Sequence, residues 1–161
     1  MRVLGNMPIS KTVVSGEGEE YVWDVFEDTK QMSTYLLAFV VSDLECKPGK
    51  KTSNNVTFQV CSRSDVINQT NFAAEIGPEI LEYYEHFFQV DFPLPKQDLV
   101  AVPGKSGAME NWGLITYGED VLLFEDGVSS LADQEHVVQV IAHELSHQWF
   151  GDLVTMKWWS E

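Results

Sequence analysis

Two histidines and a glutamate near the end of the chain have the types and spacing for metal chemistry. His143 and His147 lie four residues apart, and Glu144 follows the first of them. On an α-helix, side chains four residues apart stand one above the other on a single face. Two neutral imidazoles at that spacing can bind one Zn²⁺ at about 2.0–2.1 Å each. Glu144 projects from the next position round the helix, where a carboxylate can take a proton from a water molecule.

His-Glu-x-x-His on a helix is a signature of zinc metallopeptidases. The alternative is a pair of partly buried helical histidines bonded to neighbours, and background composition gives the pattern in about one chain in 200 of this length. The apolar periodicity around the motif favours the metal, because it predicts an amphipathic helix over about 131–150. Residues 129–133 have N-capping chemistry, and Gly151 is a plausible C-terminal stop. The apolar positions are Val137, Val138, Ile141, Leu145 and Phe150.

The elements that must position this helix begin near residue 72. Apolar residues three or four apart over 72–88 predict a helix whose regular part runs from Pro78 to Val90. Residues 91–95 are a stiff, extended linker. Short β signals follow at 98–102 and 113–117, with a weaker third at 121–124. The segment Gly107–Gly113, which contains Glu110, lies at the mouth of the second of these strands.

The first third of the chain has β patterns. Residues 21–26 and 55–61 alternate, and residues 33–41 form a continuous apolar run that predicts a strand buried on both faces. These strands resemble the end of an all-β domain, with a boundary near 64–71. If residues 35–43 pair with 56–62 as a hairpin, Cys61 lies opposite the middle of the first strand. We therefore expect no disulfide between Cys46 and Cys61.

Composition restricts the classes of partner. The formal net charge of −15, from 25 acidic and ten basic residues, argues against nucleic acid. The longest apolar run, residues 35–41, is far shorter than the roughly 20 residues of a membrane span. Because the first residues lack a signal sequence, any export signal or anchor is expected outside this stretch, if one exists. The sequons at Asn55 and Asn68 favour an exterior location weakly.

A second motif carries a family resemblance. Gly107-Ala-Met-Glu-Asn111 upstream of His-Glu-x-x-His is the paired signature of the aminopeptidase N family of zinc aminopeptidases, which are gluzincins. The chain resembles that family over nearly its whole length, in residues 32–42, 92–96, 107–117, 140–151 and 153–159. The resemblance implies an α+β chain with terminal strands of an all-β N-terminal domain and the N-terminal half of a thermolysin-like catalytic domain. Residues 1–65 would be the C-terminal part of the N-terminal β-sandwich domain, and residues 66–161 the truncated zinc peptidase domain.

The resemblance also implies a role for each matching residue. His143 and His147 match zinc ligands, and Glu144 matches the general base that activates water. Glu110 matches the acid that binds the free α-amine of a peptide substrate. The rest of that motif, Gly107, Ala108, Met109 and Asn111, would form the substrate-binding edge. The implied reaction is the release of N-terminal amino acids from peptides, with Zn²⁺ as the cofactor.

Several departures from the family pattern bear on this interpretation. The family's third ligand and its transition-state tyrosine match positions beyond Glu161, which itself does not match the ligand. We therefore expect this chain alone to bind zinc weakly and to be inactive, whereas a longer parent is active. The approach to the motif, residues 103–107, is one residue shorter than in the family. Gly118 stands where many members carry Arg.

Two rival functions remain open from the sequence. One is a bifunctional zinc epoxide hydrolase and aminopeptidase, although Ala108-Met109 favours the plain aminopeptidase. The other is a catalytically inactive homologue that serves as a receptor or binding surface. The residues that follow Glu161 in a longer parent would separate these possibilities. The expected location is the extracellular face of the plasma membrane or the secreted fraction, with the cytoplasm as the alternative. The sequence leaves side-chain specificity and oligomeric state open.

Overall fold

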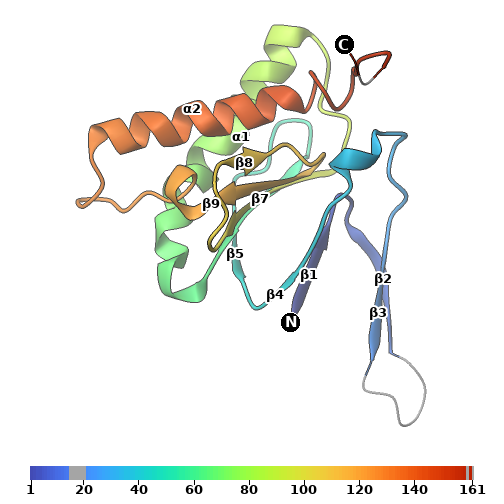
Figure 1. The fold of residues 1–161 in the computed structure, drawn as a ribbon, viewed down its shortest axis with the longest axis horizontal. Helices are drawn as coiled ribbons and strands as arrows, with labels where there is room; N and C mark the ends of the chain where they lie inside the picture. The colour runs from blue at the N-terminus through green and yellow to red at the C-terminus, as the bar shows by residue number, and fades with distance from the viewer. Residues whose placement is uncertain (15–20, 159, 161) are drawn as a thin grey trace.

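A computed structural model describes residues 1–14, 21–158 and 160. Its centre is a five-stranded sheet in the order β5-β6-β7-β9-β8 (Figure 1). The strands are β5 (Glu45–Pro48), β6 (Thr57–Ser62), β7 (Lys96–Val102), β8 (Ala108–Met109) and β9 (Leu114–Gly118). Strands β6, β7 and β9 run parallel, while β5 and β8 pair antiparallel with β6 and β9 at the two edges. The fold is thus mixed α+β.

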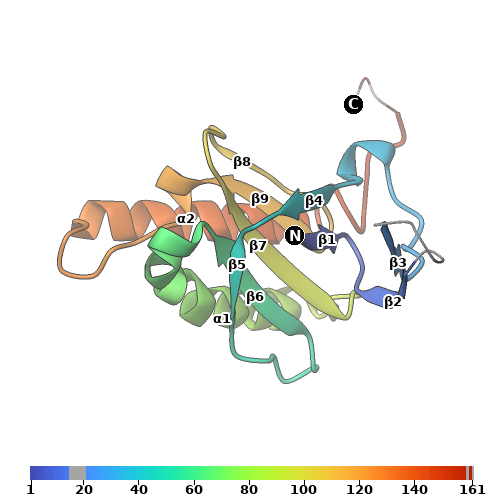
Figure 2. The ribbon, with the colours of Figure 1, turned by 90° about the horizontal axis from the view of Figure 1, so that it is seen from below.

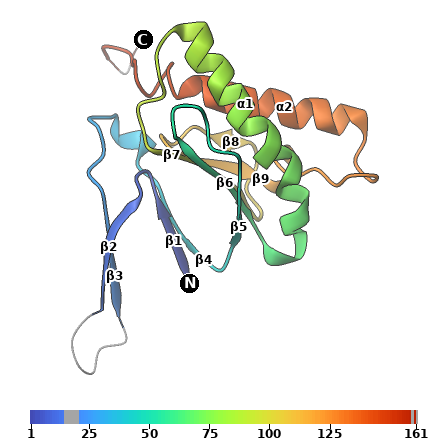
Figure 3. The same cartoon turned by 180° about the vertical axis from the view of Figure 1, so that it is seen from behind.

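Two helices, α1 (Asn71–Phe88) and α2 (Leu131–His147), cover one face of this sheet (Figure 3). Successive side chains along each strand point to opposite faces of the sheet, so each strand presents apolar residues to the helices on one face. Phe58, Leu99 and Ile115 point to the helices, whereas Cys61, Val100 and Leu114 point to the other face. On that other face they pack with Leu4 and Leu44 in a second, smaller apolar cluster. The central strand β7 is therefore buried along almost its whole length.

Two further antiparallel pairs lie beside the sheet. Strand β1 (Arg2–Gly5) pairs with β4 (Phe39–Ser42), and β2 (Ile9–Val14) pairs with β3 (Val22–Phe26). The β2–β3 ribbon projects away from the rest of the chain in Figure 1, and Figure 2 shows it on the far side of the β1–β4 pair from the five-stranded sheet. Short 3-10 helices occupy Thr34–Leu36, Ser64–Thr70 and Glu119–Val121. Among the described residues, no helix is long and apolar enough to cross a membrane.

The predicted continuous strand over 33–41 is wrong. The segment forms a 3-10 helix and then β4, and among the apolar side chains here only Leu36 is fully buried. Leu37 and Phe39 are 66% and 73% exposed, because Ala38 and Val40, which point to the opposite side, are the ones that pack against the smaller apolar cluster. The weaker strand signal at 121–124 is also wrong, since residues 119–121 form a 3-10 helix.

The expectation that Cys46 and Cys61 stay unbridged is wrong as well. The hairpin partner of β6 is β5, not residues 35–43, and Cys46 lies directly opposite Cys61 in that pair. The two form a disulfide across a sequence separation of 15 residues. The sequence pattern missed β5 because this edge strand is short, polar and ends at a proline.

The two predicted helices are present, with different bounds. Helix α2 starts at the predicted residue, where Ser130 and Asp133 form a reciprocal capping box, and ends at His147. Helix α1 begins at Asn71, earlier than predicted, so that Pro78 lies inside it. Strand β6, from the first predicted domain, shares a sheet with β7 and β9 of the second. The division into domains at 65/66 stays a prediction.

Candidate functional site

The rotation of α2 on the sheet determines where its polar residues lie. Val137, Ile141 and Leu145 are almost completely buried against the sheet and α1. This apolar stripe leaves His143 on the exposed side of the helix. Tyr84 of α1 donates its hydroxyl hydrogen bond to the carbonyl of Ala142, one residue before that histidine, at 3.1 Å. The packing of α1 thus fixes the helical turn that carries the motif.

His143 and His147 are brought together as the four-residue spacing predicts. Their Nε2 atoms lie 3.1 Å apart, with ring centroids separated by 4.7 Å. The Nδ1 atom of His147 is 2.9 Å from the carbonyl oxygen of Phe150, which can only accept a hydrogen bond. His147 therefore carries its hydrogen on Nδ1 and presents the Nε2 lone pair toward His143.

This pair fits a zinc ion. Two ligands at 2.0–2.1 Å in tetrahedral geometry have nitrogens about 3.3–3.4 Å apart, close to the observed separation. The carbonyl bonded to Nδ1 is the usual outer partner of a metal-binding imidazole. No group of three His, Cys, Asp or Glu side chains suited to a metal occurs within the described part of the chain. The histidine pair is therefore a partial ligand set.

Glu144 lies beside the pair in a desolvated position. Its side chain is buried, and Oε2 has no hydrogen-bond partner among the described residues. Burial, reinforced by the nearby charge of Glu110, raises the pKa of this carboxyl to about 7. His147 and Lys105 partly offset that rise. A carboxyl with a pKa near neutrality can exchange a proton with water at physiological pH.

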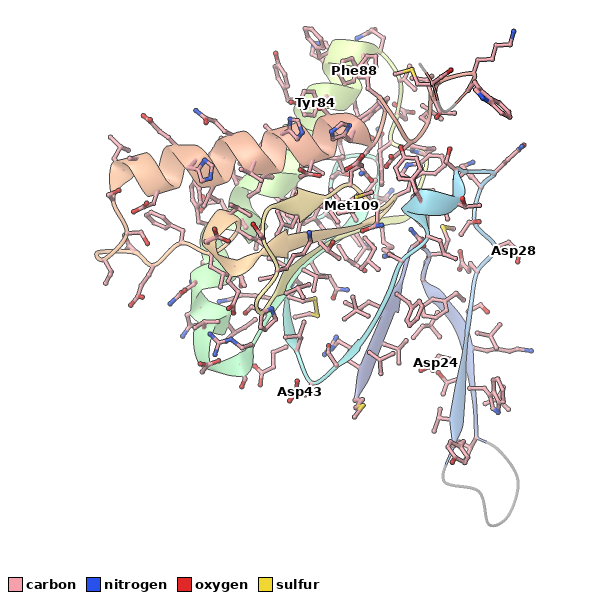
Figure 4. The ribbon with its side chains drawn as sticks, in the orientation of Figure 1. Asp24, Asp28, Asp43, Tyr84, Phe88 and Met109 are labelled. Carbon is pink, nitrogen blue, oxygen red and sulfur yellow. A yellow bond between two sulfur atoms is a disulfide. The ribbon has the colours of Figure 1, made fainter. Side chains whose placement is uncertain are left out.

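The Glu110 segment faces the same region from the edge of the sheet. Strand β8 packs against α2, and Figure 4 shows Met109 below the C-terminal half of that helix in this view. A hollow of about 470 Å³ is lined by Gly107 and Ala108 from the edge and by His143 and Glu144 from the helix. Glu110 itself is half-buried. Its charge raises the pKa values of both Glu144 and Asp152.

Asn111, the last residue of the motif, points into the protein. It is 6% exposed, and its amide nitrogen donates to the carbonyl of Leu36 at 3.4 Å. Its amide oxygen accepts from the hydroxyl of Thr116 at 3.4 Å. The structure therefore gathers four predicted residues around one hollow, holds Glu110 within electrostatic reach, and places the Asn111 side chain in the interior.

Sequence reasoning missed a buried polar network beside the motif. Gln148 is completely buried, and Asp152 is 4% exposed. Burial, then the charges of Glu110 and Glu144, raises the pKa of Asp152 to about 8. A polar residue inside the apolar run that follows His147 was the available signal. The partners of Gln148 in the turn lie tens of residues away in sequence, so this polar residue could not be assigned a role from the sequence.

Gly118 and the 103–107 segment, both singled out in the sequence, lie against each other in the structure. A Cβ atom at Gly118 would lie 2.5 Å from the carbonyl oxygen of Lys105 and 2.6 Å from Oδ1 of Asp120. The short 103–107 segment thus presses on position 118 and leaves no room for a side chain. The Gly118 N–H donates to the carbonyl of Gly107 at 2.7 Å, which ties the start of the substrate-facing edge to this contact.

Comparison with known proteins shows the family to which the chain belongs. The peptidase family M1 domain matches residues 72–161. The chain therefore belongs to the M1 family of peptidases, a family of hydrolases that includes aminopeptidases.

Three relatives illustrate the match. Endoplasmic reticulum aminopeptidase 1 of Homo sapiens is 47% identical over 98% of this chain and 17% of its own length. Aminopeptidase N of Haemonchus contortus is 47% identical over 91% of the chain and 15% of its own length. Aminopeptidase N of Acetobacter pasteurianus is 42% identical over 97% of the chain and 43% of its own length. The chain thus spans less than half of each of these relatives.

Proposed function

We propose that the chain supplies the first two metal ligands, the general base and the substrate N-terminus site of a zinc aminopeptidase. The observation that carries the proposal is the shared hollow, in which the Gly107–Ala108 edge faces His143 and Glu144. The function of the whole enzyme is proposed for the longer parent protein that contains this chain. In that parent, these residues would form the N-terminal half of a thermolysin-like catalytic domain.

His143 and His147 would hold the zinc through their facing Nε2 atoms. When bound, zinc supplies Lewis acidity and a nucleophile at neutral pH. Two imidazoles are one fewer than the three protein ligands usual at catalytic zinc. We therefore expect the 161-residue chain alone to bind zinc weakly and to hydrolyse no peptide. Appreciable turnover of an aminoacyl substrate by the purified chain with added zinc would contradict this expectation.

Glu144 would act as the general base. Its unpartnered Oε2 is free to accept a proton from the attacking water, and its desolvation raises its basicity. A purely structural role explains Glu144 less well, because a buried acid without a hydrogen-bond partner destabilises the fold. The proposed role uses both the burial and the missing partner.

The substrate would lie along β8. This strand is at the edge of the sheet and, among the residues that the structure describes, pairs with β9 alone, so its outer backbone groups can pair with an extended peptide. Such a peptide would run toward the histidines, with its first residue near Glu110. A carboxylate at that place binds an ammonium only when the residue is the N-terminus. This restriction would make the hydrolase an exopeptidase.

The test is Glu110→Ala in the parent enzyme. The matched control is Glu135→Ala, at an exposed position on α2. An exposed or half-buried charged contact to the amine contributes about 1.5–3 kcal/mol, or roughly 10- to 150-fold in kcat/KM. We expect that loss against peptides with a free N-terminus, and a much smaller loss against N-acetylated ones. Equal losses on both substrates would exclude the amine-binding role.

We also propose that the protein matures in an oxidising compartment, on the route to the cell exterior. The Cys46–Cys61 disulfide supports this, because structural disulfides are rare in the cytosol. Asn55 and Asn68, the acceptors of the two sequons, are both exposed. Treating protein from the native cell with an N-glycosidase should raise its electrophoretic mobility. No change in mobility, together with free thiols at both cysteines, would favour the cytoplasm.

A further inference from the structure

The residues that carry Glu110 into β9 form a tight turn with little conformational freedom of its own. The N–H of Leu114 donates to the carbonyl of Asn111 at 2.9 Å, and Gly113 has a φ of +77°. A Cβ at Gly113 would lie 2.7 Å from the carbonyl oxygen of Asn6, so only glycine fits there. Several backbone polar groups of this turn are bonded by buried side chains from other parts of the chain.

Gln148 makes the central contacts with this turn. Its Nε2 donates to the carbonyl of Glu110 at 3.1 Å, and its Oε1 accepts from the N–H of Gly113 at 3.0 Å. The second hydrogen on Nε2 goes to Oδ2 of Asp152, also at 3.0 Å. A glutamine amide has two N–H donors and one carbonyl oxygen, so every group is used. One side chain, adjacent to His147, thus holds both ends of the turn.

Two further side chains support the turn from the other side. Asn6 donates to the carbonyls of Trp112 and Leu36, each at 2.9 Å. Lys96 donates to the carbonyl of Gly113 at 2.8 Å, to Gly5 and to Asp98. Both side chains are less than 10% exposed, where hydrogen bonds are worth more than at the surface. The turn is therefore fixed relative to both the sheet and α2.

We infer that Gln148 is a positioning residue that sets the Glu110 carboxylate relative to the histidine pair, and so determines the preference for a free N-terminus. The inference rests on the proposed role of Glu110. In a peptide the α-amine and the first carbonyl are separated by a fixed, short distance. In a well-aligned site, displacing such a carboxylate by about 1 Å would lower the reaction rate by about 10²-fold. The buried amide of Gln148, which directly follows His147 and is bonded to both the turn and Asp152, prevents that displacement.

Gln148→Met tests the contact with little change in volume. Methionine keeps the length of the side chain but removes all three hydrogen bonds, which leaves the Glu110 carbonyl and the Gly113 N–H unpaired. Gln134→Met is the matched control, because Gln134 lies in the first turn of α2, at the opposite end of that helix from Gln148. Asn6→Ala is a second, independent variant that removes the support on Trp112. Each is made in the parent enzyme.

The measurement uses two hydroxamates that differ only in the α-amine, leucine hydroxamate and 4-methylpentanohydroxamate. Both bind zinc through the hydroxamate. The dissociation constant of the amine-free compound divided by that of leucine hydroxamate, measured by calorimetry, therefore reports the amine site separately from the metal. In Gln148→Met we expect the ratio to fall by about tenfold or more, because Glu110 loses its alignment. The affinity for the amine-free compound and the zinc content should match those of Gln134→Met. Asn6→Ala should lower the ratio by a smaller factor.

The outcomes separate this inference from the proposed function. Glu110→Ala is measured in parallel, and its ratio should fall to near that of a site without an amine contact. If it does not, the proposed amine role is wrong. If Glu110→Ala loses the preference while Gln148→Met behaves like its control, the positioning role is wrong and the proposed function stands. A Gln148→Met variant that weakens both hydroxamates equally also overturns the inference, as does an unchanged ratio in Asn6→Ala when Gln148→Met cannot fold.

Discussion

Replacing Gly118 by alanine should loosen the edge of the proposed substrate groove. The new Cβ would lie 2.5 Å from the Lys105 carbonyl oxygen, about 0.9 Å short of the 3.4 Å at which ordinary contact begins. A backbone carbonyl cannot swing away as a side chain does, so the 103–107 segment must shift. Because the Gly118 N–H bonds the Gly107 carbonyl at 2.7 Å, the start of β8 must shift too.

The expected cost follows from two opposing effects. Overpacking a close-packed site destabilises by about 1–3 kcal/mol. Gly118 has a φ of −67°, which alanine adopts freely, so the substitution also stabilises by about 0.4–1 kcal/mol through the unfolded chain. The two ranges combine to a net loss in the free energy of unfolding of about 0–2.6 kcal/mol, with a midpoint of about 1.3 kcal/mol, measured by urea denaturation.

A second readout connects the clash to the groove. Affinity for the amine-free hydroxamate should fall in Gly118→Ala, because β8 lines the hollow. Val128→Ala is the control, since that side chain is 74% exposed and lies away from the hollow. Adding Asp120→Ala to Gly118→Ala should recover part of the stability by removing one of the two close contacts. A Gly118→Ala protein as stable as the wild type, with unchanged affinity for the amine-free hydroxamate, would refute the proposed link between Gly118, the 103–107 segment and the groove.

Two further predictions concern the buried groups around the site. Replacing Cys46 and Cys61 by serine should lower the free energy of unfolding by about 3 kcal/mol, from the closure of a 15-residue loop, and equal denaturation midpoints would contradict it. For Asp152 the folded pKa of about 8 lies above the ordinary 3.8, so the folded metal-free protein binds the proton more tightly than the unfolded chain. Its stability should therefore fall as pH rises from about 4 to about 8, and Asp152→Asn, which keeps an acceptor for Gln148, should flatten that fall in urea titrations.

Local patterns were enough to predict the helix that carries the motif. The apolar stripe of α2 and its capping box are both set by residues close in sequence. Strands β7 and β9 were found for the same reason, since each is a short apolar run between turn signals. The spacing of His143 and His147 then placed their rings together without any knowledge of the rest of the fold.

Pairing between distant segments could not be predicted in the same way. The run over 33–41 looked like a strand buried on both faces, but its burial depends on the distant cluster around Leu4 and Leu44, against which one face of β4 packs. Strand β5 is polar and short, so the partner of Cys61 was missed. The contacts of Gln148 with Glu110 and Gly113 join residues 38 and 35 positions apart. Their role depends on the tertiary fold. The sequence shows only a glutamine inside an apolar run.

The most direct test of the central claim is a crystal structure of the parent enzyme with leucine hydroxamate, with anomalous data collected at the zinc edge. The account predicts a zinc peak bonded to Nε2 of both His143 and His147. It also predicts the α-amine of the ligand within hydrogen-bond distance of the Glu110 carboxylate. A zinc peak on other residues, or an amine directed away from Glu110, would contradict the account.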